Sequence, residues 1–106
     1  SMVHSELTGV YRITMTLPAW TVENELTLLP EENGVLGGSL NTLDGSPPIP
    51  FTRGRWNKNC FQLDAAVGPG RLQLTGRVEG GVLGGVVVIE DTPDLLRGAR
   101  IQTEIR

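Results

Sequence analysis

The side chains that could carry out chemistry in this chain are few, and the most suggestive pair is an acid and an arginine. Asp64 and Arg53 lie on either side of the turn signal Asn57-Lys58-Asn59, so a hairpin would place them across from each other. If the pair faces the interior, it could bind a ligand or serve acid–base catalysis. If it faces outward, it is a surface ion pair of about 0.2–1 kcal/mol. The pattern favours the outward position.

Glu23 and Glu25 form a second candidate for acid–base chemistry. They are two residues apart in an alternating segment, which places them on one face of a strand at a separation of about 7 Å. Paired carboxylates at such a spacing serve some hydrolytic reactions. On an outward face they only interact with water, and this reading is favoured. The enzymatic hypothesis, a small isomerase or cyclase that uses one of these pairs, therefore ranks below non-catalytic readings.

Other catalytic and cofactor chemistries find little support. His4 and Cys60 are the single histidine and the single cysteine, so a zinc site or a disulfide within the chain is not expected. Cys60 would need cationic neighbours to be a reactive thiolate. The glycine-rich stretch 34–38 contains no Lys-Ser/Thr partner and is not a phosphate-binding loop. We predict no catalytic residue, no cofactor and no metal.

Composition limits the partners that we expect. The chain has 106 residues and a formal net charge of −3, which argues against nucleic acid as a partner. No apolar run approaches the ~18 residues of a membrane span. The single cysteine fits a cytoplasmic protein, although a removed signal peptide stays open. We expect one domain over residues 1–106, with a flexible N-terminus at residues 1–6 that includes a tag remnant.

A short phrase occurs twice and indicates how the fold is organised. Gly34-Val35-Leu36-Gly37-Gly38 returns 47 residues later as Gly81-Val82-Leu83-Gly84-Gly85. A repeat at half the length of the chain predicts two similar halves. Paired glycines within strands are typical of sharp bends or of a close approach by a neighbouring backbone.

Turn signals at short intervals divide the chain into about eight segments. Most segments alternate apolar and polar residues as strands do, and in the last one Ala99, Ile101, Thr103 and Ile105 are expected to face the core. A single helical turn is expected at 92–96. We predict an all-β fold, an antiparallel up-and-down meander of about eight strands that forms a small barrel with two similar four-stranded halves. A two-sheet sandwich is the alternative.

The seventh segment, 82–89, is apolar on both faces. Val82, Val86 and Val88 share one face, and Leu83, Val87 and Ile89 share the other. A strand that is apolar on both sides in so small a protein needs an additional cover. We expect a second subunit to supply it, so Val82, Val86 and Val88 are the predicted interface of a homodimer.

Two tryptophans could mark a ligand site. Trp20 and Trp56 both lie near turns and so near a rim of the barrel, where an aromatic ring could stack on a flat ligand or close the core. With Arg53 and Asp64 they make up the predicted ligand-binding residues.

The layout resembles the calycin superfamily, which includes the avidins and lipocalins. Gly9-Val10-Tyr11 opens the first strand where those families show Gly-x-Trp, and Arg97 or Arg100 lies in the last strand. In those families an arginine of the last strand often lies across the closed end of the barrel. The resemblance implies binding of small apolar ligands and frequent oligomers.

Three functional hypotheses follow. The first is a non-catalytic barrel that binds a small apolar or aromatic ligand at one end. The second is a homo-oligomeric assembly module that uses the apolar strand 82–89. The third is the small barrel isomerase or cyclase.

Overall fold

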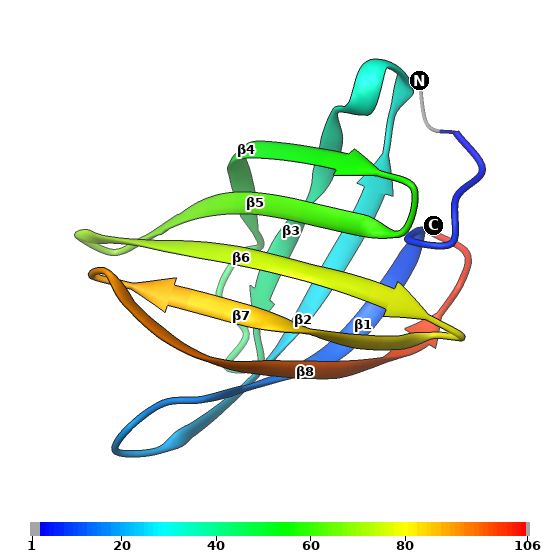
Figure 1. Ribbon diagram of the computed structural model, residues 1–106. Helices are drawn as coiled ribbons and strands as arrows, with labels where there is room; N and C mark the ends of the chain where they lie inside the picture. Colours follow the sequence, from blue (N-terminus) through cyan, green and yellow to red (C-terminus); the bar gives the residue numbers. More distant parts are fainter. Residues whose placement is uncertain (1–2, 106) are drawn as a thin grey trace.

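The fold is a closed β-barrel. The structure is a computed structural model that describes residues 3–105. The elements within these residues are β1 Gly9–Thr16, β2 Thr21–Pro30, η1 Glu32–Gly34, β3 Leu36–Thr42, β4 Ile49–Asn57, β5 Cys60–Val67, β6 Gly70–Glu79, β7 Val82–Ile89 and β8 Thr92–Gln102. Each strand pairs antiparallel with the next, and β1 also pairs with β8 to close the barrel (Figure 1). The predicted eight-stranded up-and-down barrel is confirmed, and the two-sheet sandwich is excluded.

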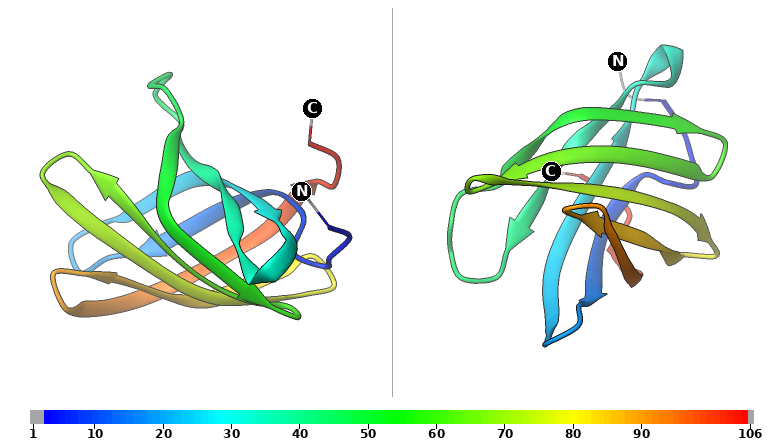
Figure 2. Two further views of the ribbon diagram at one scale, coloured as in Figure 1. Left: turned by 90° about the horizontal axis from the view of Figure 1, so that it is seen from above. Right: turned by 60° about the vertical axis from the view of Figure 1, so that its left-hand side comes forward.

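The barrel has two ends. The β2–β3, β4–β5 and β6–β7 connections lie at one end together with the first and last described residues (Figure 1). We call this the Arg100 end. The other four connections lie at the opposite end, which we call the Asn24 end. There the loop at residues 43–48 projects from the barrel wall (Figure 2).

Tight turns connect the strands where the sequence supplies residues that tolerate a positive φ. Gly80 and Gly81 have φ values of 56° and 79° between β6 and β7. Glu90 and Asp91, at 49° and 66°, play the same part between β7 and β8. Two successive residues in this region form the turns whose twist suits a two-residue hairpin. The predicted helical turn at 92–96 is wrong, because Asp91 is part of this hairpin turn and the residues from Thr92 onward belong to β8.

The interior of the barrel is filled with side chains from all eight strands. The buried apolar cluster also includes Leu7, which precedes β1. From the strands it contains Tyr11, Ile13, Met15, Leu26, Leu28, Leu36, Leu40, Phe61, Leu63, Leu74, Val78, Leu83, Val87 and Leu96, and Ile49, Phe51 and Trp56 of β4 pack against it. Alternation with a period of two places these residues inside because successive side chains of a strand point to opposite faces.

The two copies of the repeat occupy corresponding hairpins. Leu36 and Leu83, the central leucines, are both buried. A Cβ atom added at Gly38 would lie 1.9 Å from the carbonyl oxygen of Thr27, and one added at Gly85 would lie 2.0 Å from that of Thr75. In each half the last glycine therefore allows the neighbouring strand to approach closely, as the repeat predicted.

The last strand differs from the expected register. Arg100, not Ile101, faces inward, and Ala99, Ile101 and Thr103 are exposed. The phase of the strand causes the difference, because Leu96, Gly98 and Arg100 share the inner face; the bulge follows only after Arg100, which pairs with Tyr11 whereas Gln102 pairs with Val10. The expectation that Ala99, Ile101 and Thr103 face the core is wrong.

One seam of the barrel is short. β3 and β4 pair only through Ser39 with Pro50 and Leu40 with Ile49, and an isolated bridge joins Val35 to Arg55. The other neighbouring strands pair over most of their length. The wall between β3 and β4 therefore has the shortest ladder of backbone pairing.

Candidate functional site

The two tryptophans of the predicted ligand site lie at opposite ends of the barrel. Trp20 is 65% exposed in the β1–β2 turn at the Asn24 end. Trp56 is half-buried near the Arg100 end, where its Nε1 donates a hydrogen bond to the carbonyl oxygen of Glu31 at 2.8 Å. Glu31 follows the last residue of β2, whereas Trp20 precedes its first. The full length of β2 separates them, so one small ligand does not contact both.

Arg53 and Asp64 are cross-strand neighbours on the outer surface. They pair in register between β4 and β5, next to a bulge that follows Phe51. Among the described residues, ion pairs within 4 Å join Arg12 to Glu25 and Arg77 to Glu79, and none joins Arg53 to Asp64. The depression beside them has a volume of about 130 Å³ and lies on the outer wall. Outward placement agrees with the favoured reading of the sequence.

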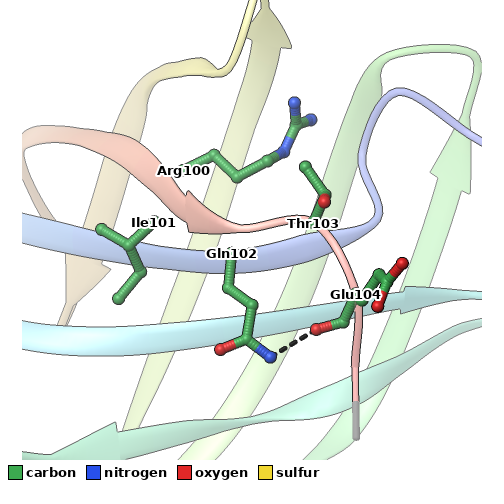
Figure 3. A pocket seen from close by; sticks show the side chains of 5 residues that line it. All are labelled: Arg100, Ile101, Gln102, Thr103 and Glu104. Carbon is green, nitrogen blue, oxygen red and sulfur yellow. Dashed lines mark hydrogen bonds between the residues drawn. The ribbon is translucent and has the colours of Figure 1, made fainter.

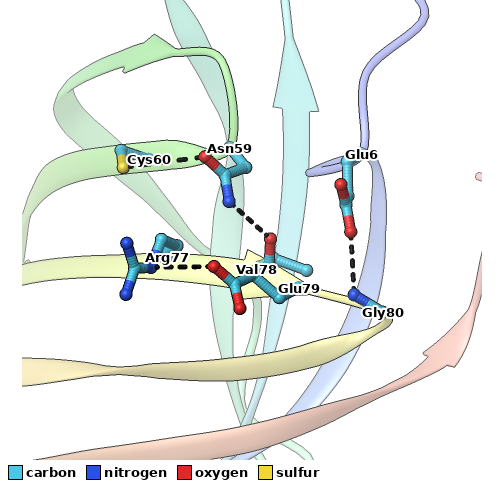
Figure 4. A network of polar contacts seen from close by, with 7 residues as sticks. All are labelled: Glu6, Asn59, Cys60, Arg77, Val78, Glu79 and Gly80. Atoms are coloured by element: carbon cyan, nitrogen blue, oxygen red, sulfur yellow. Dashed lines mark hydrogen bonds and ion pairs between the residues drawn. The ribbon is translucent and has the colours of Figure 1, made fainter.

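The remaining candidates for chemistry also face outward. Glu25 binds Arg12 through an ion pair of 3.1 Å, and Glu23 lies exposed on the same face of β2. Cys60 is exposed, and its Sγ lies 3.9 Å from Oδ1 of Asn59 (Figure 4). His4 is exposed as well. Residues 3–105 contain no group of three His, Cys, Asp or Glu side chains that could hold a metal ion.

The Arg100 end is closed by a polar network around the single tyrosine. Nη2 of Arg100 donates to the hydroxyl of Tyr11 at 2.8 Å, and that hydroxyl donates to the carbonyl oxygen of Leu7 at 2.8 Å. The same Nη2 also donates to the carbonyl oxygen of Glu6. Burial raises the pKa of Tyr11, and the neighbouring guanidinium partly offsets this effect. The network joins the N-terminal segment to the last strand.

The N-terminal segment packs over this end. Besides the buried Leu7, Val3 donates a backbone hydrogen bond to Pro30 at 3.0 Å. The carboxylate of Glu6 accepts one from the backbone N–H of Gly80 at 2.8 Å (Figure 4). The predicted flexibility of residues 1–6 stays a prediction, and the first two of them lie outside the described residues.

The end of β8 and the residues after it border a broad open depression. Its volume is about 590 Å³, and it is lined by residues 100–104 (Figure 3). The side chain of Gln102 donates to the carbonyl oxygen of Glu104 there. Because the lining comes from one continuous stretch of chain, the depression does not enclose a ligand on several sides.

The most distinctive surface lies on the outside of β7 and β8. Val82 is 64% exposed, Val86 41% and Leu95 50%. Cross-strand register joins Val82 to Ala99, Val86 to Leu95 and Val88 to Pro93. We call these six residues the β7–β8 face. The sequence pattern predicted the outward position of Val82 and Val86; it missed Leu95, which was assigned to a helical turn.

Charged pairs border this face on both sides. On β6 the guanidinium of Arg77 lies 3.4 Å from the carboxylate of Glu79 (Figure 4). On the other side, Arg12 of β1 binds Glu25 of β2. Arg97 lies within the face, in register with Gly84. Apolar residues bordered by charged pairs are common at protein interfaces, and here one further charge, that of Arg97, lies among the apolar residues.

A buried polar side chain lies inside the barrel toward the Asn24 end. Asn24 is 4% exposed, and among residues 3–105 it is the one buried residue with an amide or charged side chain. Its Nδ2 is 3.5 Å from the carbonyl oxygen of Asn41, and its Oδ1 has no hydrogen-bond partner. Around this end the core is bordered by half-buried apolar side chains, namely Leu17, Val22, Ile49, Leu72 and Ile89.

Comparisons with known proteins add no family assignment. No family model matches the chain, and no curated protein matches it. Within residues 3–105 there is no helix of the length and hydrophobicity that a membrane span requires.

Proposed function

We propose that this barrel is a homo-oligomeric assembly module that dimerises through the β7–β8 face. The observation that carries the proposal is the row of cross-strand apolar pairs on a surface that has no cover from the described part of the chain. Exposed apolar area of this kind costs free energy in water at about 25 cal/mol per Å². A second copy that presents the same face removes it from water on both sides, as a two-fold interface does.

The size of the face predicts a weak dimer. The eight residues of β7 extend over about 26 Å, and four neighbouring strands span about 19 Å. Because four strands make up half of the closed barrel and curve away from a flat contact, each copy would bury at most roughly 500 Å², a total near the lower limit for a specific interface. We therefore expect dissociation on the order of micromolar concentrations.

The repeat supplies a matched control for the test. Val82→Glu places a carboxylate on the β7–β8 face, whereas Val35→Glu makes the same change at the corresponding position of the β2–β3 hairpin, which is also exposed. Sedimentation velocity over a concentration series should show that Val82→Glu raises the dissociation constant at least about 30-fold, because an unpaired charge is buried. Val35→Glu should leave it unchanged. A wild-type protein that stays monomeric at several hundred micromolar would refute the proposal.

A second candidate function is the binding of a small apolar molecule at the Asn24 end. The observation in its favour is Oδ1 of Asn24, a buried acceptor without a partner below a ring of half-buried apolar side chains. A ligand with an apolar body and one O–H or N–H donor would satisfy it. The resemblance to the calycins also favours this candidate, because an arginine of the last strand, Arg100, lies over Tyr11 at the opposite end with its guanidinium carbon 5.3 Å from the ring centre.

The ligand hypothesis has its own experiment. A series of medium-chain alcohols is titrated into the protein while NMR follows the side-chain amide of Asn24 and the indole N–H signals of Trp20 and Trp56. We expect saturable shifts at Asn24, with no response from the indole of Trp56 at the other end. If no alcohol in the series shifts the Asn24 amide, the ligand hypothesis is wrong.

A further inference from the structure

Two cross-strand pairs on the outside of β7 and β8 combine a large residue with a small one. Val82 lies beside Ala99, and Arg97 lies beside Gly84. A Cβ atom added at Gly84 would meet nothing within 4 Å, so open space lies above its backbone between the outward side chains of Val82 and Val86, and we call this space the hollow. Arg97 is exposed in the adjacent strand. The surface therefore has a projection and a hollow side by side at its centre.

Symmetry allows two arrangements when such a face meets its copy. The two-fold axis lies in the plane of contact, either along the strands or across them. An axis along the strands places β7 of one copy against β8 of the other. An axis across the strands places β7 against β7 and β8 against β8.

We propose that the two-fold axis runs along the strands, so that Arg97 of each copy packs into the hollow at Gly84 of the other. This inference depends on the proposed dimer. In the same arrangement Val82 meets Ala99 of the second copy, and Val86 meets Leu95. Each large side chain thus faces a small or complementary one, which is the condition for close packing between sheets.

Charges at the rim favour the same axis. In register across the barrel wall, Glu79 of β6 pairs with Val82, Val82 with Ala99, and Ala99 with Arg12 of β1. An axis along the strands therefore places Glu79 of one copy opposite Arg12 of the other. An axis across the strands instead places β6 opposite β6 and β1 opposite β1, and these contacts bring Glu79 and Arg12 no closer together.

The arginine inside the face also has a partner in this arrangement. A guanidinium that leaves water needs a carboxylate within reach, because a buried unpaired charge is costly. The aliphatic part of Arg97 would cover Gly84 of the second copy while its charged end extends to the rim. There the carboxylates of Glu79 of the second copy and of Glu25 lie among the guanidinium groups of Arg97, Arg12 and Arg77, the last of which is in register with Gly84.

An exchange of the two central residues tests this arrangement. Gly84→Arg fills the hollow and places two guanidinium groups face to face, so we expect the dissociation constant to rise at least about 10-fold. The double variant Gly84→Arg with Arg97→Gly restores the projection and the hollow in exchanged positions. We expect it to recover to within about threefold of the wild type. The single variant Arg97→Gly separates the two arrangements: it empties the hollow and weakens the dimer if the axis runs along the strands, whereas in the β7-on-β7 arrangement it removes a contact between two Arg97 side chains and strengthens the dimer.

Cross-linking provides a second, independent measurement. In a Cys60→Ser background, Thr14→Cys places a thiol on β1 and Arg77→Cys places one on β6. The β1 strand of one copy lies opposite β6 of the other only when the axis runs along the strands. A short bifunctional maleimide should join the two variants in a mixture much faster than it joins either variant to itself. Equal or preferential self-linking, or failure of the double variant to recover, overturns this inference. A monomeric wild type instead overturns the proposed dimer.

Discussion

The guanidinium of Arg100 donates from Nη2 to the hydroxyl of Tyr11 at 2.8 Å and lies over its ring. This contact joins the first strand to the last at the point where the barrel closes. Gly9 permits it, because a Cβ atom at that position would lie 2.6 Å from the carbonyl oxygen of Gln102 and 3.1 Å from Nε of Arg100. The Gly9-x-Tyr11 signature thus has a steric basis in the packing of the last strand.

Alkaline titration should detect this network. Because burial raises the pKa of Tyr11, its contribution to stability is complete below about pH 10 and is lost as the pH rises through the raised value. Absorbance of the phenolate at 295 nm reports this residue alone, since the chain has one tyrosine. Arg100→Met removes the guanidinium that favours the phenolate, so we expect the midpoint to move higher still. A midpoint at or below the ordinary value in the wild type would contradict this account.

The same network explains one failure of sequence reasoning. Alternation predicted that Ile101 faces the core, because apolar residues normally occupy the inner face. In the structure the inner face of β8 continues from Leu96 through Gly98 to Arg100, so Ile101 points outward. The inward arginine is stabilised by the Tyr11 hydroxyl and the carbonyl of Glu6, which are distant in sequence. No local pattern contains that information.

The glycines of the repeat offer a direct test of the packing between strands. Gly85→Ala would place a Cβ atom 2.0 Å from the carbonyl oxygen of Thr75, which neither backbone can avoid without moving apart. We expect a loss of at least about 3 kcal/mol in the free energy of unfolding. Gly84→Ala is the matched control, since its Cβ meets nothing, and it should change stability by less than about 1 kcal/mol. Urea unfolding of each variant is measured at a protein concentration below the dissociation constant of the dimer. Equal losses in the free energy of unfolding for the two variants would refute the steric explanation.

Arg53 and Asp64 provide a test of the outward reading. They are in register but form no ion pair within 4 Å in the described part of the chain. Asp64→Asn should therefore change the free energy of unfolding by less than about 0.5 kcal/mol. Glu25→Gln, which removes the ion pair with Arg12, is the comparison variant and should cost up to about 1 kcal/mol. If Asp64→Asn lowers the free energy of unfolding by more than about 2 kcal/mol, the carboxylate makes a stabilising contact and the outward placement of Asp64 is wrong.

The separation of Trp20 and Trp56 could have been predicted from the topology alone. In an up-and-down barrel successive turns alternate between the two ends, and Trp20 lies in the first turn whereas Trp56 precedes the fourth. An odd and an even turn lie at opposite ends. By contrast, the outward position of Val82 and Val86 was readable from alternation, because it requires only the direction of one strand.

Asn24 supplies the sharpest test of what fills the Asn24 end. If Oδ1 has no partner in solution, Asn24→Leu removes a desolvated acceptor and fills the same space with apolar atoms. The free energy of unfolding should then rise by about 1–2 kcal/mol. Asn57→Leu, at an exposed position of β4, controls for the general effect of added apolar surface. If Asn24→Leu instead destabilises the barrel by about 1 kcal/mol or more, either the bond from Nδ2 to Asn41 or a molecule bound to Oδ1 stabilises the native state. NMR detection of a long-lived water or ligand at this amide would then identify the molecule that the asparagine holds.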